Sequence, residues 1–222
     1  MFTDTPTATI RRMSTADLLT LTQWLSPAFP LGAFAYSHGL EQAVAAGEVR
    51  DADGLQGWLL DIVQLGAGRN DAVLLSMTHR GADAAEMAAL ARALAPTRER
   101  WEETSAQGRA FADTVTAMGH SVAPAALPVA VGQAARRLSL DTAQVTALYL
   151  HGFAANLVSA GVRFIPLGQT EGQVTLGGLH GAIDDLAAWA ATAGRDDLGG
   201  ATIRADLGAA LHETMDVRIF RS

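Results

Sequence analysis

Residues 101–118, with the sequence WEETSAQGRAFADTVTAM, carry apolar and small side chains in a helical pattern. These side chains recur at alternating steps of three and four residues: Trp101, Thr104, Gly108, Phe111, Val115 and Met118. That period places them on one face of an α-helix, and such a stripe is normally buried. The stretch therefore predicts a long helix with one face in a core.

Capping residues and apolar periods predict further helices on both sides of this stretch. Ser14, Asp83 and Asp141 are each followed three residues later by Asp17, Glu86 and Gln144, which is the spacing of a helix-start capping box. Helices are expected over about 36–46, 141–162, 170–189 and 203–215, among others. Because no run alternates between apolar and polar residues over the length of a strand, we predict an all-α, single-domain fold of about nine or ten helices.

The ends of the chain look different from this helical body. Residues 1–13 are rich in threonine and poor in core residues, so we expect a flexible N-terminal arm. The helical domain is expected to span 14–215, and 216–222 to form a C-terminal tail. That tail alternates arginine with bulky apolar residues, which are common anchors at protein interfaces.

The composition excludes several kinds of chemistry. Among 222 residues there is no cysteine and no lysine, so all 16 basic residues are arginine. Thiolate catalysis, thiolate metal sites, a P-loop lysine and a Schiff-base lysine are therefore excluded. The net charge of −7 argues against a broad nucleic-acid-binding surface. No apolar run approaches the ~20 residues of a membrane span, and no signal-peptide pattern is found, so a cytoplasmic protein is expected.

Two segments resemble enzyme motifs without their required context. Residues 35–39, AYSHG, are similar to a nucleophile elbow around Ser37, but an elbow needs a parallel sheet and none is predicted. We interpret Ser37 instead as the N-terminal cap of a helix. Residues 212–216, HETMD, are similar to a zinc-protease helix in which aspartate replaces the second histidine. A surface helix end is the preferred interpretation, and since no two of the six histidines are close in sequence we predict no metal site.

Four glycines lie within one expected helix: Gly172, Gly177, Gly178 and Gly181. Each costs up to about 1 kcal/mol relative to alanine in a helix. Either they permit close approach of another helix, within the chain or across a dimer, or the helix is broken.

Three segments together resemble the UreF family of urease accessory proteins. They are residues 26–41 (SPAFPLGAFAYSHGLE), 163–173 (RFIPLGQTEGQ) and 218–222 (RIFRS). Their order and spacing are similar to the family's over nearly the whole chain from about residue 17. Ile219 departs from the leucine usual at that position, and an aromatic residue often found just upstream is missing.

The resemblance implies an all-helical, two-fold dimer that is not an enzyme and has no cofactor or metal of its own. Proteins of this family bind a second accessory protein, UreD (also called UreH), and then the nickel-carrying GTPase UreG. The assembly docks on apo-urease and delivers nickel to its carbamylated-lysine centre. A stand-alone serine hydrolase or metallohydrolase is the competing class.

The resemblance also suggests which residues contact partners. It implies that Tyr36, Ser37, His38 and Glu41 shape the scaffold and the partner surface. Arg163, Gln169 and Gln173 belong to the second motif, and Arg163 could either act as an arginine finger toward UreG or pack beneath its own turn. The tail residues Arg218, Phe220, Arg221 and Ser222 are expected to bind UreD.

Overall fold

The computed structural model describes residues 14–32, 36–216 and 218–220. Within these residues there are eleven α-helices, one short 3-10 helix and no strand, so the all-α prediction is confirmed. The helices are α1 (Thr15–Trp24), α2 (Leu40–Ala45), α3 (Ala52–Leu65), α4 (Ala67–His79), α5 (Ala84–Ala93), α6 (Arg98–Ala117), α7 (Leu127–Ala135), α8 (Thr142–Phe164), α9 (Gln169–Gly178), α10 (His180–Ala190), η2 (Arg195–Asp197) and α11 (Ile203–His212).

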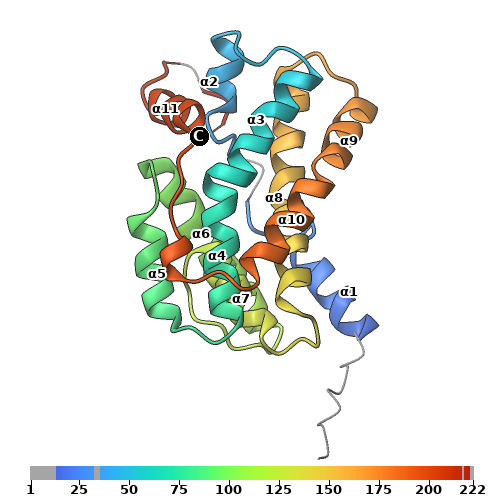
Figure 1. The fold of residues 1–222 in the computed structure, drawn as a ribbon, viewed down its shortest axis with the longest axis vertical. Coiled ribbons are helices and arrows are strands. Elements are labelled where there is room, and N and C mark those ends of the chain that lie inside the picture. The colour runs from blue at the N-terminus through green and yellow to red at the C-terminus, as the bar shows by residue number, and fades with distance from the viewer. Residues whose placement is uncertain (1–13, 33–35, 217, 221–222) are drawn as a thin grey trace, which may run out of the picture.

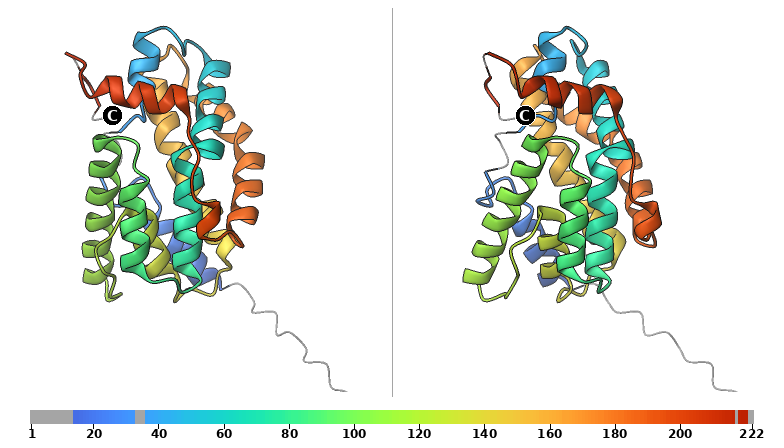
Figure 2. Two further views of the ribbon diagram at one scale, coloured as in Figure 1. Left: turned by 60° about the vertical axis from the view of Figure 1, so that its left-hand side comes forward. Right: turned by 90° about the vertical axis from the view of Figure 1, so that its left-hand side faces the viewer.

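Helix α4 lies in the middle of the bundle and contacts α3, α5, α7, α8 and α10. Helices α9 and α10 lie on one side of α3 and α4, while α5 and α6 lie on the other (Figure 1). Helix α11 runs across one end of the bundle, where it packs on α2 (Figure 2). This crossing brings the end of the chain close to its N-terminal third.

The stripe predicted on residues 101–118 is helix α6, and its centre is buried. Thr104, Gly108, Phe111 and Val115 are all buried, whereas Met118 follows the helix and is 43% exposed. Phe111 contacts Trp24 in an edge-on arrangement, with ring centroids 6.0 Å apart. A side chain at Gly108 would overlap the carbonyl oxygen of the 125–126 peptide bond, so α6 and the following loop approach closely because this residue is glycine.

Helix α2 begins at Leu40, four residues later than expected from the sequence. His38 and Gly39 adopt left-handed backbone conformations, with φ of 52° and 74°, which an α-helix cannot contain. A Cβ at Gly39 would also lie 2.6 Å from the backbone nitrogen of Ala209. Gly39 therefore both turns the chain and lets α11 approach α2.

The helix expected over 170–189 is two helices, α9 and α10, which meet at Leu179. Two of its glycines permit close approach: a Cβ at Gly172 or Gly178 would lie 2.7 Å from a side chain of α8 or α3. Gly177 and Gly181 have no neighbouring atom within 4 Å. Both interpretations of the glycines thus apply within the chain. The last helix also ends earlier than expected, at His212.

Helix α8 is the one described helix that is long and apolar enough to cross a membrane. Its 23 residues include a window with a mean hydropathy of 1.3, and half of that window is buried inside the bundle. Tyr149, Leu150 and Leu157 are among its buried residues, and α8 packs on α4, α9 and α10. This burial is typical of a core helix.

Candidate partner-binding site around the C-terminal segment

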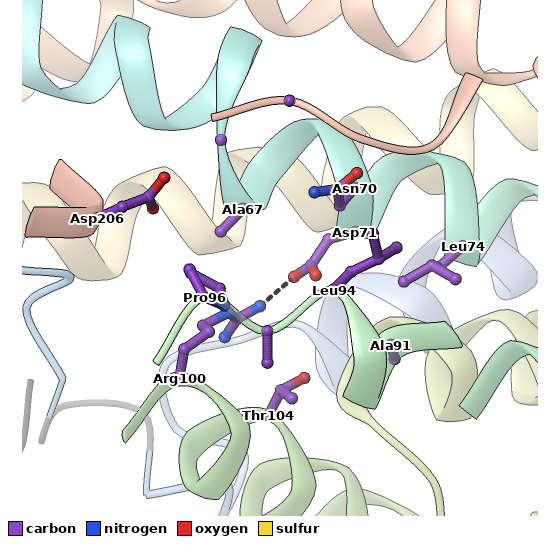
Figure 3. A pocket seen from close by; sticks show the side chains of 13 residues that line it. Ala67, Asn70, Asp71, Leu74, Ala91, Leu94, Pro96, Arg100, Thr104 and Asp206 are labelled. Carbon is purple, nitrogen blue, oxygen red and sulfur yellow. Dashed lines mark hydrogen bonds and ion pairs between the residues drawn. The ribbon is translucent and has the colours of Figure 1, made fainter. Parts of the chain in front are cut away.

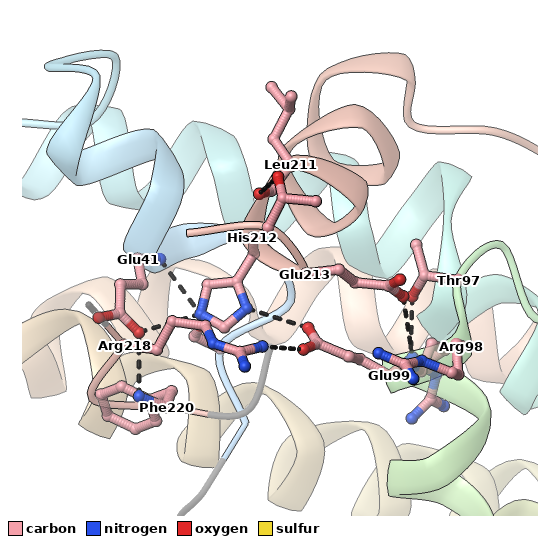
Figure 4. Close-up of polar contacts among 12 residues, drawn as sticks. Glu41, Thr97, Arg98, Glu99, Leu211, His212, Glu213, Arg218 and Phe220 are labelled. Carbon is pink, nitrogen blue, oxygen red and sulfur yellow. Dashed lines mark hydrogen bonds and ion pairs between the residues drawn. The ribbon is translucent and has the colours of Figure 1, made fainter. Parts of the chain in front are cut away.

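His212, the last residue of α11, is fully buried between two glutamates (Figure 4). Its Nε2 lies 3.1 Å from Oε2 of Glu41, and its Nδ1 lies 3.0 Å from Oε2 of Glu99. Each ring nitrogen therefore lies within hydrogen-bonding distance of a carboxylate oxygen from a different helix. The three side chains therefore join α2, α6 and α11 through charge-assisted hydrogen bonds.

Glu41 also binds the backbone of residues 218–220, called the C-terminal segment below. Its Oε1 accepts a hydrogen bond from the N–H of Ile219 at 2.8 Å, and its Oε2 accepts one from the N–H of Phe220 at 2.9 Å. Burial alone would raise the pKa of Glu41, but these two bonds and His212 outweigh it and lower the pKa below 4.5. The carboxylate is thus ionised when it holds the segment.

Glu99 is the second attachment point. It lies in the first turn of α6, after the capping residue Thr97, and its Oε1 accepts a hydrogen bond from Nη1 of Arg218 at 2.7 Å. Its own N–H donates to Oε1 of Glu213 at 3.2 Å. The free N–H groups at a helix start favour carboxylates, so this end of α6 suits the acidic cluster.

Phe220 packs beside the group of Glu41, Glu99, His212 and Arg218, called the C-terminal cluster below. It is 5% exposed, and its ring centroid lies 4.9 Å from that of Phe164 at the end of α8. The guanidinium of Arg163 lies over the same ring, 5.8 Å from its centroid. The segments around residues 41, 163 and 220, which are far apart in sequence, therefore meet at one place.

The turn before α2 positions Glu41. The N-cap of α2 is Gly39 and not Ser37 as predicted, but the Oγ of Ser37 accepts a hydrogen bond from the N–H of Glu41 at 3.4 Å. A Cβ at Gly208 on α11 would lie 3.3 Å from the carbonyl oxygen of Gly39. Because these two glycines let α2 and α11 pack closely, His212 reaches the carboxylate of Glu41.

A second buried network lies beneath the first. Arg100 donates to Asp71 at 2.6 Å and to Glu103 at 2.8 Å, and Nε2 of His38 makes an ion-pair contact with Glu103 at 2.9 Å. The hydroxyl of Tyr149 donates to Asp71 at 2.6 Å. Each charged group here has an opposite partner, which buried charges require.

The pKa values in this network follow from its pairs. Burial would raise the pKa of Glu103, but His38 and Arg100 lower it to about 2. Burial would lower the pKa of Arg100, yet Asp71 and Glu103 raise it above its ordinary value. Burial raises the pKa of Tyr149, and the charge of Asp71 raises it further. Arg100 and Glu103 are therefore ionised at neutral pH, and the hydrogen bonds of Arg100 and Tyr149 to Asp71 connect α4 with α6 and α8.

A pocket opens beside Arg100 and Asp71 (Figure 3). It is also lined by Asn70, Thr104 and Asp206, and it has room for only a few water molecules. The facing charges of Arg100 and Asp71 are paired with each other. This pocket therefore resembles the hydrated edge of a structural ion pair.

The two enzyme-like motifs lack the geometry that their chemistry needs. Ser37 is fully buried, and within 14–32, 36–216 and 218–220 there is no sheet on which an elbow could stand. His212 is engaged by two glutamates through both ring nitrogens, so neither nitrogen is available to a metal. Among the residues described, no group of three or more His, Asp or Glu side chains is arranged to hold a metal ion.

The structure brings some of the predicted site residues together and separates others. Those that meet in or beside the C-terminal cluster are Ser37, Glu41, Arg163, Arg218 and Phe220. Tyr36 is buried and lines a cavity with His38, which belongs to the deeper network. Gln169 and Gln173 are exposed on α9, outside the cluster. Arg221 and Ser222 lie outside the described residues.

Three residues in or beside the cluster were not predicted as site residues: Glu99, Phe164 and His212. The only signal for Glu99 was its place in the first turn of a helix, two residues after Thr97. His212 stood out in the sequence through its similarity to a metal motif and, with Glu213, through its fit to the family resemblance, but it was not named as a site residue. Their shared site arises from the crossing of α11 over α2, which no local pattern encodes.

Exposed apolar side chains adjoin the cluster. Ile203, Leu207 and Leu211 follow one another at four-residue steps on α11 and are 79%, 57% and 47% exposed. Ile219 in the C-terminal segment is 76% exposed. Exposed apolar residues next to arginine are typical of surfaces that bind other proteins.

Comparison with known proteins gives a consistent family. A model of the UreF family matches residues 49–180. The chain is 59% identical to the urease accessory protein UreF of Cereibacter sphaeroides over 208 residues, which cover 93% of this chain and 99% of that protein. It is 52% identical to UreF of Jannaschia sp. over 210 residues, covering 94% and 96% of the two chains. It is 53% identical to UreF of Paracoccus denitrificans over 206 residues, covering 92% and 95%. The chain therefore belongs to the UreF family of urease accessory proteins.

Proposed function

We propose that this chain is a non-enzymatic adaptor in urease maturation. It binds UreD (UreH), recruits the GTPase UreG and brings both to apo-urease, where nickel enters the dinuclear centre. Membership of the UreF family supports a role as a urease accessory protein. Arg100 is paired with Asp71, and His212 contacts Glu41. These buried polar side chains bind one another, as is expected of a protein that acts as a scaffold.

The arrangement of the C-terminal segment is the observation that carries this proposal. Glu41 holds the segment by its backbone N–H groups, and Phe220 is buried beneath it. The side chains of Arg218 and Ile219 remain exposed, at 39% and 76%. A segment fixed by its backbone loses little entropy when its outward side chains meet a partner. We assign this surface to UreD.

Substitution of Ile219 tests this assignment. Ile219→Asp places a charge on the proposed surface without removing a buried group, so the fold and the melting temperature should not change. Val174→Asp on α9 is the matched control, since Val174 is 71% exposed and lies outside the cluster. We expect pull-down of UreD to be lost with Ile219→Asp and retained with Val174→Asp. Equal binding by both variants would refute the assignment.

We further propose that the assembled protein modulates GTP hydrolysis by UreG. Arg163 is exposed near the cluster, with its guanidinium over the ring of Phe220. If it supplied charge to the γ-phosphate, Arg163→Ala would lower UreG turnover strongly, because an arginine finger contributes about 10³–10⁵-fold. An unchanged turnover number would assign Arg163 to packing of the C-terminal segment alone.

We propose that the adaptor is a cytoplasmic homodimer. Light scattering of the purified full chain should give about twice the mass of 23.2 kDa. Cell fractionation should place the protein with cytoplasmic markers. A monomer that nevertheless binds UreD would remove the dimer from the mechanism and leave the partner assignment intact.

A further inference from the structure

Two histidines that are distant in the sequence form a pair on the surface of the bundle. His151 lies on α8 and His180 is the first residue of α10. Their ring centroids are 5.5 Å apart with an interplanar angle of 45°, and both residues are exposed. The sequence predicted no metal site because no histidines are close along the chain, but the packing of α10 on α8 brings these two together.

The separation of the rings fits two ligands of one metal ion. An imidazole nitrogen binds Zn²⁺ at about 2.0–2.1 Å, so two rings on one tetrahedral ion have centroids about 5 Å apart. The observed separation is close to this value before any ion is bound, and exposed side chains can adjust their rotamers. Little reorganisation is therefore needed for both rings to bind.

An acidic residue lies close to the pair along α10. Asp184 follows His180 by four residues, which is one helical turn, so its carboxylate lies on the same side of the helix. A cation bound by the two rings would therefore have a negative charge nearby.

We propose that His151 and His180 chelate one divalent transition-metal ion of the kind that prefers imidazole nitrogen, such as Ni²⁺, Zn²⁺ or Cu²⁺. Water fills the other positions, since no third His, Asp or Glu joins the pair among the described residues. Structural metal sites use four protein ligands, so a site with two is open and exchangeable. The bound ion would tie α8 to the start of α10. This inference does not depend on the proposed function.

Calorimetric titration of the full chain with NiCl₂ tests the proposal, with any polyhistidine tag removed. We expect wild type to bind about one ion per chain at this site. The expected loss for His151→Ala or His180→Ala is more than about tenfold in affinity, because even removing an outer partner of a ligand costs about 10–100-fold. His120→Ala is the control, since His120 contacts Trp24 and lies outside the pair. Its affinity should equal that of wild type.

A second readout separates chelation from a structural effect of the substitutions. Ni²⁺ should raise the melting temperature of wild type and of His120→Ala, because binding to the folded state stabilises it. It should leave that of the double variant His151→Ala/His180→Ala unchanged, while all variants have the same circular dichroism spectrum. Absence of Ni²⁺ binding by wild type, or wild-type affinity in the double variant, would overturn the proposal.

Discussion

Glu41→Gln is the most informative perturbation of the C-terminal cluster. The substitution keeps the size of the side chain but replaces one carboxylate oxygen by an NH₂ group. That group faces a hydrogen-bond donor, either the N–H of Ile219 or Phe220 or the ring of His212. Hydrogen bonds to charged groups contribute about 1.5–3 kcal/mol each, and an unsatisfied buried donor costs about 1–3 kcal/mol. We therefore expect the bound conformation of the C-terminal segment to be destabilised by about 2 kcal/mol relative to a conformation in which the segment is detached from Glu41.

Hydrogen exchange measures this loss directly. A change of about 2 kcal/mol corresponds to an increase of about 30-fold in opening of the segment. The amides of Ile219 and Phe220 should exchange faster by that factor, while amides in α4 and α8 remain unchanged. Glu48→Gln is the control, because Glu48 pairs with Arg204 at the surface. Unchanged exchange at Ile219 and Phe220 in Glu41→Gln would refute the role of Glu41 as the anchor.

The remaining predictions concern packing, buried charge and the end of the chain. In urea unfolding, Gly108→Ala should lower the free energy of unfolding by about 2–3 kcal/mol, because its methyl group would overlap a backbone carbonyl. Gly177→Ala, which meets no atom within 4 Å, should gain up to about 1 kcal/mol; equal effects would contradict the packing. Glu103→Gln should lose about 3 kcal/mol at neutral pH, because Arg100 keeps only one buried partner. The pKa of Glu103 falls from 4.5 to about 2 on folding. The difference in unfolding free energy between wild type and Glu103→Gln should therefore stay constant down to pH 4.5 and shrink as the pH falls toward 2. A difference that already shrinks above pH 5 would contradict this assignment. Phe220→Ala should expose the C-terminus to carboxypeptidase without lowering the melting temperature of the bundle, and unchanged digestion would show that Phe220 does not hold the segment.

Local sequence rules predicted most of the helices because their signals lie within a few residues. The side chains of Ser14, Asp83 and Asp141 each accept a hydrogen bond from the N–H three residues later, as predicted. Of these three, only Asp141 and Gln144 also make the reciprocal bond of a full capping box. The start of α2 was predicted wrongly. Its left-handed residue His38 is maintained by distant contacts, an ion pair with Glu103 and an edge-on contact with Phe153. A rule limited to neighbouring residues cannot include such contacts.

The cluster was only partly accessible to the same reasoning. The resemblance selected Glu41, Arg218 and Phe220. In the structure the carboxylate of Glu41 accepts hydrogen bonds from the backbone N–H groups of Ile219 and Phe220. Glu99 and His212 complete the cluster from α6 and α11, and their place depends on how α11 crosses the bundle. Pairing between residues more than 100 positions apart is a property of packing. Sequence periodicity describes one face of one helix at a time.

Co-purification of UreD with a chain that lacks residues 216–222 tests the central claim most directly. The truncated chain keeps α1 to α11, so its helical content should match that of the full chain. We predict that UreD co-purifies with the full chain and is absent from the truncated one. Full retention of UreD by a folded, truncated chain would show that the C-terminal segment is not the partner surface.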